Sequence, residues 1–406
     1  MAPLPVLGTD VTSALLAEAD RRVPAMVELL LRLAEMESPS ADPASQGPVL
    51  DVLEDELGRR GFATRRLPGL RSGGVLVAAP GGARAAFQLL VGHADTVWPQ
   101  GTTARRSPTL TDGVITGPGT YDMKAGLVQM LTAWDILAAT GQAPEVRPVV
   151  LVNTDEEIGS RESTPTIAAL AAGADRVLVL EPSLGLHGAL KTARKGLGRY
   201  TVTVHGRAAH AGLDPTAGAS AILELSSVIQ QLFALNDAER GTTVNVGMVS
   251  GGIQPNVVAP ESSAVVDVRV LTATEAAEVD AAIRALTAVT PGTSLTVEGG
   301  MGRPPLERTE RNQQLFARAH GLADAMGFDL PEATAGGGSD GNTASRLAPT
   351  LDGLGAVGDG AHAEHEHVLV EPWAQRTALL AGLLLLPPVR AGAGGDPWAL
   401  LPDAAG

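Results

Sequence analysis

The sequence contains no cysteine. Disulfide bonds and thiolate metal sites are therefore excluded, and any metal ion that this chain binds must be held by histidine, aspartate, glutamate or water. Aromatic residues are also scarce, at 3% of the chain, which is too few for platforms on which nucleic-acid bases stack. Lysine and arginine number 30 against 45 aspartates and glutamates, a formal net charge of −15. A nucleic-acid partner needs a basic face, so this class of partner is excluded.

Long hydrophobic runs are missing as well. The longest, ALLAGLLLL at residues 378–386, is shorter than the roughly 20 residues that a transmembrane helix needs, and it predicts a buried helix. The N-terminal residues show no basic start followed by an apolar core, so no secretory signal is expected. We therefore predict a cytoplasmic protein with no membrane partner.

What is present is the pattern of an α/β protein, and 406 residues are enough for two domains. Short runs rich in valine and leucine, typical of strands buried on both faces of a parallel sheet, cover 75–80, 87–93, 149–157 and 176–183. Helical periodicity covers 11–37, 49–61 and 125–141. The tail at 391–406 is rich in glycine, alanine and proline and is predicted to be loosely ordered.

The pattern changes near residue 196, where GRYTVTVHG (198–206) alternates between polar and apolar residues. The segments that follow predict a helix at 218–237, strands at 242–252 and 262–271, a helix at 274–289 and a strand at 293–300. This order is the split βαβ motif of a ferredoxin-like domain. We therefore predict an α/β domain with a mostly parallel sheet at 1–195 and 305–406, interrupted by an inserted α+β ferredoxin-like domain at 196–304.

Potential metal ligands follow three of the predicted buried strands. His93 ends the run LLVGH, Asp155, Glu156 and Glu157 end VVLVNTDEE, and Glu181 ends RVLVLE. Open parallel sheets bind ligands outside the carboxyl ends of their strands, so we expect these side chains to meet at one edge.

Two further stretches add candidates. Asp122 lies in GPGTYDMKAG (117–126) before a predicted helix, and several histidines lie in GDGAHAEHEHV (358–368). Taken singly, each has a plain explanation: an aspartate often caps a helix, and clustered histidines often lie in a solvated loop. Two histidines and three carboxylates, with one more glutamate beside them, instead suit a catalytic zinc pair with an adjacent base.

The motifs GHADTV, GPGTYDMKAG, NTDEEIGS and LEPS occur in this order. With them the chain resembles the zinc-dependent aminoacylase and carboxypeptidase family, which includes glutamate carboxypeptidases, acetylornithine deacetylase and succinyl-diaminopimelate desuccinylase. RAAHAG, GGIQPNVV, GRPP, GGGSDGN and HAEHEHV extend the resemblance over nearly the whole chain, and the likeness is greatest to the glutamate carboxypeptidase branch. It implies a homodimer, with a catalytic dinuclear zinc domain and an inserted domain for dimerisation.

The resemblance implies two zinc ions per chain, for which Co²⁺ or Mn²⁺ can substitute. It implies five ligands: Asp122 bridging both ions, His93 and Glu181 on one, and Glu157 and His362 on the other.

Two neighbouring residues take supporting roles under the same resemblance. Glu156 would be the general base, and Asp95 would hydrogen-bond His93 and fix its tautomer. The family motif places the late histidine four residues before a glutamate, which selects His362 and leaves His365 as the alternative.

The inserted domain would complete the substrate site. His210 would reach the active site of the partner subunit and stabilise the oxyanion, and Asn256 and Arg303 would bind the free carboxylate of the substrate. Gly337 and Gly338 would line the pocket. An ordinary ion pair is the alternative for Arg303, and a phosphate loop is the alternative for the glycines, although the lysine of such loops is missing.

The implied activity is metal-dependent hydrolysis of an amide bond next to a free carboxylate. The substrate would be a small peptide or an N-acyl amino acid, and glutamate is the first candidate for the released amino acid. An N-acyl amino acid deacylase on the same scaffold is the alternative. A non-catalytic binding protein is a second alternative, which loss of the base or of a ligand would indicate; none is lost.

Overall fold

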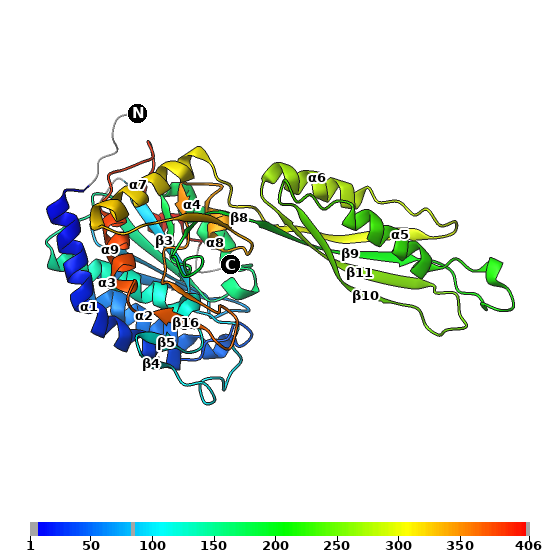
Figure 1. The fold of residues 1–406 in the computed structure, drawn as a ribbon, viewed down its shortest axis with the longest axis horizontal. Helices are drawn as coiled ribbons and strands as arrows, with labels where there is room; N and C mark the ends of the chain where they lie inside the picture. The colour runs from blue at the N-terminus through cyan, green and yellow to red at the C-terminus, as the bar shows by residue number, and fades with distance from the viewer. Residues whose placement is uncertain (1–6, 83–85, 403–406) are drawn as a thin grey trace. The chain divides into compact units, whose positions relative to one another are not determined.

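The computed structural model describes residues 7–82 and 86–402, and its contacts divide the chain into two units (Figure 1). The first unit contains the residues up to Thr192, Arg308–Thr334 and the residues from Ser339 on; the second contains Ala193–Glu307 and Ala335–Gly338. Residues 1–6, which begin the segment considered for a secretory signal, lie outside the described residues.

A six-stranded sheet forms the centre of the first unit, with the strand order β1-β2-β6-β3-β7-β14. Its strands are β1 (Phe62–Leu67), β2 (Val75–Pro80), β6 (Arg147–Asn153), β3 (Phe87–His93), β7 (Val177–Val179) and β14 (Thr350–Leu351). β3 runs parallel to β6 and β7, and β14 runs parallel to β7. The predicted α/β class with a mostly parallel sheet is confirmed. The run at 75–80 departs from this parallel arrangement, since β2 is antiparallel to both of its neighbours.

Helices cover both faces of this sheet, which explains why its strands lack alternation. One face packs against α1 (Thr9–Glu35), α2 (Gly47–Arg59), α3 (Ala125–Ala139), α7 (Glu310–Met326) and α9 (Trp373–Leu384). The other face packs against α4 (Thr164–Gly173) and α8 (Asp340–Ala344). In β3, Leu90 joins the first core while Leu89 and Val91 join the second. Neighbouring positions of such a strand are therefore both buried, and most of them are apolar.

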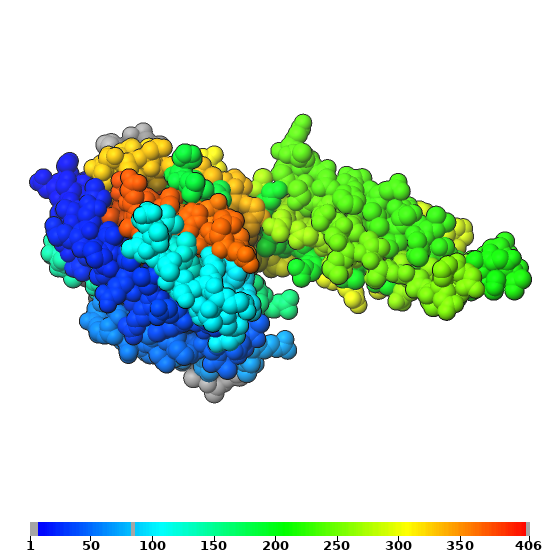
Figure 2. All heavy atoms as spheres, turned by 60° about the horizontal axis from the view of Figure 1, so that its bottom comes forward, coloured from blue at the N-terminus to red at the C-terminus, as the bar shows by residue number. Residues whose placement is uncertain are grey.

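A small four-stranded sheet brings together segments that are far apart in the chain. It has the order β15-β16-β5-β4, with strands β4 (Thr109–Thr111), β5 (Val114–Thr116), β15 (Gly358–Asp359) and β16 (His367–Leu369). β16 pairs with β5, so the segments near 115 (cyan) and 368 (orange) lie side by side (Figure 2). A two-stranded sheet joins β8 (Leu190–Arg194) to β13 (Glu332–Ala335).

The second unit is an antiparallel sheet with the order β10-β11-β9-β12 and two helices on one face (Figure 1). Its elements are β9 (Gly196–His205), α5 (Ala221–Phe233), β10 (Thr243–Gly251), β11 (Glu261–Val270), α6 (Ala273–Arg284) and β12 (Ser294–Arg303). Alternate residues of β9 and β11 are buried. Both the element order and the strand order are those of the ferredoxin-like domain expected from the sequence.

Two further expectations concern helices and the tail. Among the described residues, no helix combines the length and the apolar character needed to span a membrane. The expectation of a loose tail is wrong for residues 397–401, which form η5 (Pro397–Leu400) and bury Leu401 in the core beside α4. Residues 391–396 form no helix or strand. The side chains of Trp398 and Leu400 pack against the same core, so burial of apolar side chains outweighs the flexible composition.

Candidate metal centre

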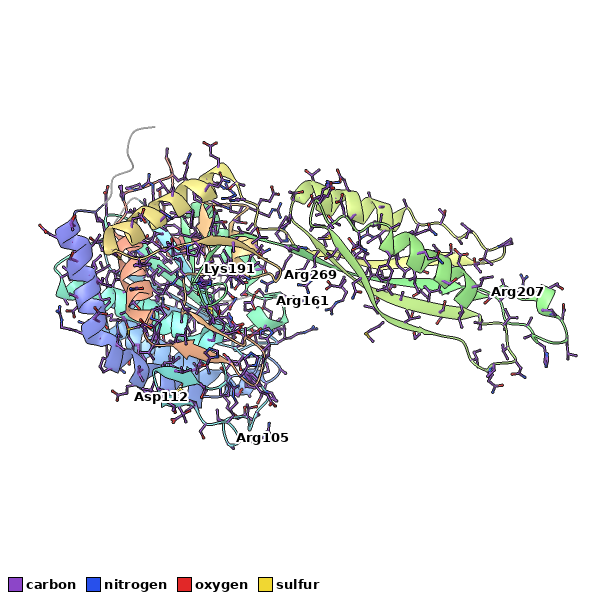
Figure 3. The ribbon with its side chains drawn as sticks, in the orientation of Figure 1. Arg105, Asp112, Arg161, Lys191, Arg207 and Arg269 are labelled. Carbon is purple, nitrogen blue, oxygen red and sulfur yellow. The ribbon has the colours of Figure 1, made fainter. Side chains whose placement is uncertain are left out.

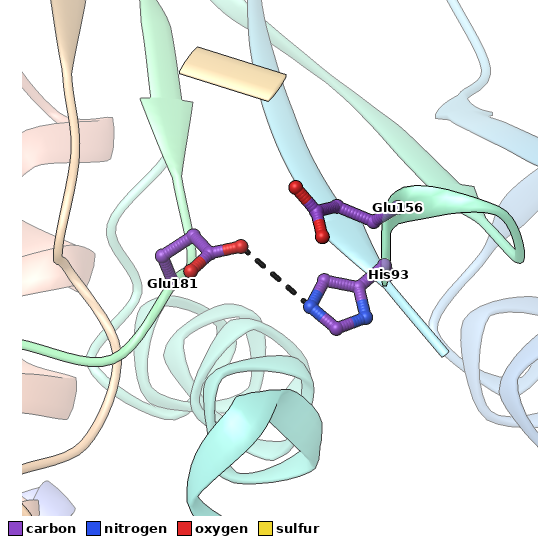
Figure 4. Close-up of side chains that lie close together, drawn as sticks. All are labelled: His93, Glu156 and Glu181. Carbon is purple, nitrogen blue, oxygen red and sulfur yellow. Dashed lines mark ion pairs between the residues drawn. The ribbon is translucent and has the colours of Figure 1, made fainter. Parts of the chain in front are cut away.

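The candidate ligands converge at the carboxyl ends of neighbouring strands of the main sheet. His93 is the last residue of β3 and is 1% exposed. Glu156 and Glu157 begin the short helix η3 (Glu156–Ile158) after β6, and Glu181 lies just beyond β7. Potential ligand atoms of His93, Glu156 and Glu181 lie within 4.8 Å of one another (Figure 4). Parallel strands with a common direction bring these groups to one edge, as expected.

Asp95, two residues after His93, sets the tautomer of the His93 ring. Its Nδ1 lies 3.0 Å from the main-chain oxygen of Asp95 and 3.4 Å from Asp95 Oδ1. A carbonyl oxygen only accepts hydrogen bonds, so Nδ1 carries the proton and donates it. The nearer partner is therefore the carbonyl of Asp95 rather than its carboxylate. Nε2 lies 3.3 Å from Asp122 Oδ1 and 3.6 Å from Glu181 Oε1, and it is the nitrogen whose lone pair becomes available when the ring is neutral.

The buried carboxylate of Asp95 braces the turn that carries both glutamates. Its Oδ1 accepts the N–H of Glu156 at 3.3 Å, and its Oδ2 accepts the N–H of Glu157 at 3.2 Å. Oδ2 also accepts the hydroxyl of Ser40 at 2.6 Å. Asp95 thereby ties the end of β3 to the turn after β6 and holds this turn beside His93.

Asp122 lies between two histidines from distant parts of the chain. Its Oδ1 is 3.3 Å from His93 Nε2, and its Oδ2 is 3.3 Å from His362 Nε2. His362 Nε2 is also 2.9 Å from Glu157 Oε2. Each histidine therefore lies near two of the predicted carboxylate ligands, and Asp122 is near both histidines. Potential ligand atoms of His93, Asp122 and Glu157 also lie within 4.8 Å of one another. One carboxylate with a different histidine against each oxygen fits a site for two metal ions.

The chemistry of these donors fits a divalent metal. The side chain of Glu157 is 5% exposed, and within residues 7–82 and 86–402 no hydrogen-bond donor reaches its buried Oε1. A buried carboxylate oxygen without a partner is costly, and a cation supplies that partner. Nitrogen and oxygen donors without sulfur suit zinc and also cobalt or manganese.

His362, rather than His365, faces the carboxylates. His362 has a φ of 63°, a left-handed conformation that is uncommon outside glycine and that concentrates at functional sites. Its Nε2 reaches Asp122 and Glu157. His365 instead contributes its main-chain oxygen, 2.9 Å from His367 Nδ1. The geometry therefore favours His362 as the late ligand.

Without metal, protons occupy this centre. Hydrogen bonds to Asp122 and Glu157 raise the pKa of His362 to about 10. Burial opposes a charge on His93, but Asp122 and the other nearby carboxylates outweigh it and raise its pKa well above the usual value. Burial raises the pKa of Glu157 to about 7. Metal ligands must be neutral imidazoles and ionised carboxylates, so metal and protons compete for these atoms.

Metal affinity is expected to rise with pH for this reason. Below a pH of about 10, the metal-free centre keeps a proton on His362 that the metal-bound centre lacks, so raising the pH removes a competitor. Each displaced proton strengthens apparent binding about tenfold per pH unit. Calorimetric titration with Zn²⁺ in buffers of different ionisation heat counts these protons. An affinity that stays constant from about pH 6 to about pH 8 would contradict the assignment.

One buried carboxylate at this centre received no role from the sequence. Glu366, the glutamate of the motif that selected His362, is 0% exposed. It accepts hydrogen bonds from the indole of Trp98 and from three backbone N–H groups of residues 119–122. The spacing of the motif marked the position, but its partner Asp122 lies 244 residues earlier in the chain, and no local pattern connects the two.

In the second unit, His210 and Asn256 are neighbours. The N–H of Ala211 donates to the main-chain oxygen of Asn256 at 3.0 Å. Nδ1 of His210 accepts the N–H groups of Gly212 and Leu213, each at 3.2 Å. Because Nδ1 accepts, Nε2 is the ring nitrogen that carries a proton. Because the side chain is exposed, this N–H is available as a donor.

Arg303 and the glycine segment 336–338 are also neighbours. Arg303 ends β12 and pairs with Leu197 at the start of β9. A Cβ added to Gly338 would lie 3.0 Å from Leu197 Cδ1 and 3.3 Å from Arg303 Cδ, so this close approach favours glycine. Arg269, labelled in Figure 3, donates to the main-chain oxygen of the first glycine at 2.8 Å and anchors the segment.

β9 separates these two groups of predicted substrate residues. It runs for 10 residues, roughly 30 Å at about 3.3 Å per residue. Arg303 lies beside its first residues, whereas His210 follows its last residue, His205. Within one copy of the second unit, His210 and Arg303 are therefore not brought together.

Comparisons with known proteins agree with this geometry. The model of the family "Peptidase family M20/M25/M40" matches residues 89–386. Carboxypeptidase G2 from Pseudomonas sp. (strain RS-16) is 28% identical over 372 residues, covering 89% of each chain. An acetylornithine deacetylase from Myxococcus xanthus is 31% identical over 255 residues, covering 58% of this chain and 64% of the relative.

Similarity to solved structures bears on the fold. An M20 family metallo-carboxypeptidase from Sulfolobus solfataricus superposes with a TM-score of 0.70 at 16% identity, covering 89% of this chain and 99% of that chain. An aminopeptidase from Bacillus cereus gives a TM-score of 0.73 at 22% identity, covering 89% and 98%.

Proposed function

The chain belongs to the peptidase family M20/M25/M40, and on this premise we propose that it is a dinuclear zinc carboxypeptidase. It hydrolyses the amide bond next to a free carboxylate and releases a C-terminal amino acid, with glutamate as the first candidate. The observation that carries the proposal is Asp122, each of whose carboxylate oxygens lies 3.3 Å from a different histidine. The catalytic domain is assigned to 1–195 and 305–406, and the dimerisation domain to 196–304.

Each side chain of the centre then has a chemical task. Two zinc ions, when bound, would polarise the scissile carbonyl and lower the pKa of a water molecule. Glu156 would accept the proton of that water and pass it to the leaving amine. His93, Asp122 and Glu181 already supply three protein ligands, the number that leaves a position for water at a catalytic zinc. Glu156 is therefore assigned as base, although it lies close enough to His93 to bind metal.

We assign His210 to the active site of the partner subunit of a homodimer. The separation between His210 and Arg303 along β9 supports this, because one copy cannot bring both to one substrate. Exposed apolar side chains on the second unit support a dimer. They lie on α5, β10 and the following loop: Ile222 (49% exposed), Leu223 (61%), Met248 (68%), Val249 (59%) and Ile253 (68%). Asn256, the neighbour of His210, would act from the partner in the same way.

Arg303 is assigned to the free carboxylate of the substrate, and Arg303→Ala is expected to lower kcat/KM by about 10- to 100-fold. A charge-assisted, bidentate contact is worth roughly 1.5–3 kcal/mol, which corresponds to that factor. Lysine is expected to rescue only in part, since it lacks the planar fork. The measurement compares a substrate that has a free α-carboxylate with the same substrate amidated.

Arg284→Ala provides the matched control for this experiment. Arg284 lies on α6 of the same unit, pairs with Asp280, and donates to the main-chain oxygen of Gly299 in β12 at 2.8 Å. Its loss therefore removes another arginine held against the same strand, and measures how far a disturbance of β12 by itself affects the two substrates. If Arg303→Ala impairs both substrates equally, the effect is structural and the carboxylate is bound elsewhere. An effect confined to the free acid identifies Arg303 as the carboxylate anchor.

The substrate class is tested by a panel of dipeptides and N-acyl amino acids, with purified, zinc-loaded protein. Release of C-terminal glutamate from peptides supports the carboxypeptidase. Cleavage confined to acetyl- or succinyl-amino acids supports the deacylase alternative. Similarity to the acetylornithine deacetylase is the observation that favours this alternative. Metal bound without turnover of any member of the panel would support a binding protein.

Two other parts of the proposal need their own measurements. Elemental analysis identifies the metal, and cell fractionation tests the predicted cytoplasmic location.

A further inference from the structure

The fully buried carboxylate of Glu366 binds the backbone beside a predicted metal ligand, but it is not itself one of the predicted ligands. Glu366 Oε1 accepts the backbone N–H groups of Tyr121 at 3.0 Å and Asp122 at 3.1 Å. Its Oε2 accepts the backbone N–H of Gly119 at 2.9 Å and the indole N–H of Trp98 at 2.8 Å. Each oxygen thus holds two donors, and three of the four donors belong to the short segment that carries the bridging ligand.

This segment needs such a brace because regular structure does not hold it. Asp122 has φ −112° and ψ 97°, values that break the helical geometry of η2 (Thr120–Lys124). His93, by contrast, is the last residue of β3 and is paired in register with Asn153 of β6. The main sheet therefore holds His93 in place, whereas the backbone of Asp122 is held through Glu366.

The same brace also reaches the late histidine. Glu366 lies four residues after His362, in the connection between β15 and β16. Its backbone N–H donates to the main-chain oxygen of Ala363 at 3.0 Å, and its main-chain oxygen accepts from the guanidinium of Arg106 at 2.8 Å. One side chain thus connects the segment that bears Asp122 to the segment that bears His362.

We propose that Glu366 is a positioning residue, which holds the segments that bear Asp122 and His362 in a fixed position relative to each other. It thereby selectively sets the affinity for the metal ion whose ligands are Asp122, Glu157 and His362. The inference rests on the two-metal centre of the proposed function. The other ion keeps His93 and Glu181, which are attached to the ends of the main sheet, and is therefore less dependent on Glu366.

Glu366→Gln tests this at nearly constant size. An amide offers one acceptor oxygen and one N–H₂ group, so two of the four N–H donors face another donor in either orientation of the amide. Partners that orient metal ligands typically contribute 10–100-fold to metal affinity. We expect one of the two Zn²⁺ sites to weaken by about 10- to 100-fold while the other stays close to wild type.

Glu37→Gln is the matched control. Glu37 also accepts backbone N–H groups, from Gly101 at 2.6 Å and Thr103 at 2.7 Å, and it accepts the Thr103 hydroxyl at 2.9 Å. None of these donors belongs to the segments that bear Asp122 or His362. Its replacement is expected to lower the melting temperature without changing either metal affinity, so it separates a general loss of stability from a loss of ligand positioning.

The experiment titrates Zn²⁺ into chelator-treated wild type and both variants, followed by calorimetry. Activity of Glu366→Gln is expected to shift to higher zinc concentration and to recover most of kcat when zinc is in excess. Two zinc affinities equal to those of wild type in folded Glu366→Gln would overturn the proposal, as would an equal shift in Glu37→Gln.

If Glu366→Gln does not fold, Trp98→Phe removes a single donor to Glu366. Several-fold weaker binding of one zinc is then expected, and zinc binding equal to that of wild type overturns the proposal. A wild type that binds no zinc refutes the metal centre itself.

Discussion

Glu156→Gln is expected to lower kcat by about 10²- to 10⁴-fold, the range that general acid–base catalysis contributes. Glutamine keeps the size of the side chain but cannot accept a proton. The turn that carries it stays in place, because Asp95 binds the backbone N–H groups of residues 156 and 157 rather than the side chain. Metal content is therefore expected to stay at the wild-type value, which elemental analysis measures beside steady-state kinetics.

Metal content also decides between the two roles that the geometry allows Glu156. If it is a ligand, as its position within 4.8 Å of His93 and Glu181 permits, the glutamine variant loses metal together with activity. Glu162→Gln is the control for disturbance of the turn: Glu162 lies in the same loop but binds Leu70, Arg71 and Ser72. Near-normal turnover in Glu156→Gln would remove this residue from the mechanism.

Two inactive chains are expected to restore activity when they are combined. His210→Ala removes a donor to the oxyanion, a loss of about 10²- to 10³-fold in kcat, and Glu156→Gln removes the base. If His210 acts across the dimer, the mixed dimer contains one site with an intact Glu156 and an intact His210 from the partner. Its second site lacks both groups, so about half of the wild-type activity per dimer is expected.

The measurement requires dimers of verified composition, for example with a different affinity tag on each chain. A mixture of His210→Ala with wild type serves as the control for subunit exchange. No recovery in a verified mixed dimer would mean that His210 serves its own chain or none. Absence of any dimer in solution would refute the assignment more directly, because the two groups of substrate residues lie at opposite ends of β9.

Much of the fold was predictable because its patterns are local. The strands before His93 and Glu181 are continuous apolar runs, since helices cover both faces of the main sheet. The alternation in β9 and β11 follows from a sheet with one buried face. Strand direction was less accessible. The run at 75–80 has the same apolar composition as the parallel strands of the sheet, yet β2 is antiparallel to both of its neighbours, because composition reflects burial and not strand direction.

The sequence by itself determined which side chains can reach the carboxyl edge of the main sheet, because each of those residues directly follows an apolar strand. Only the tertiary structure decided how Asp122 meets His362 and how Glu366 holds both of their segments. These contacts depend on the pairing of β5 with β16 and on hydrogen bonds across 244 residues of chain. Loops have no periodicity, so their partners are set by the packing of the elements that they connect.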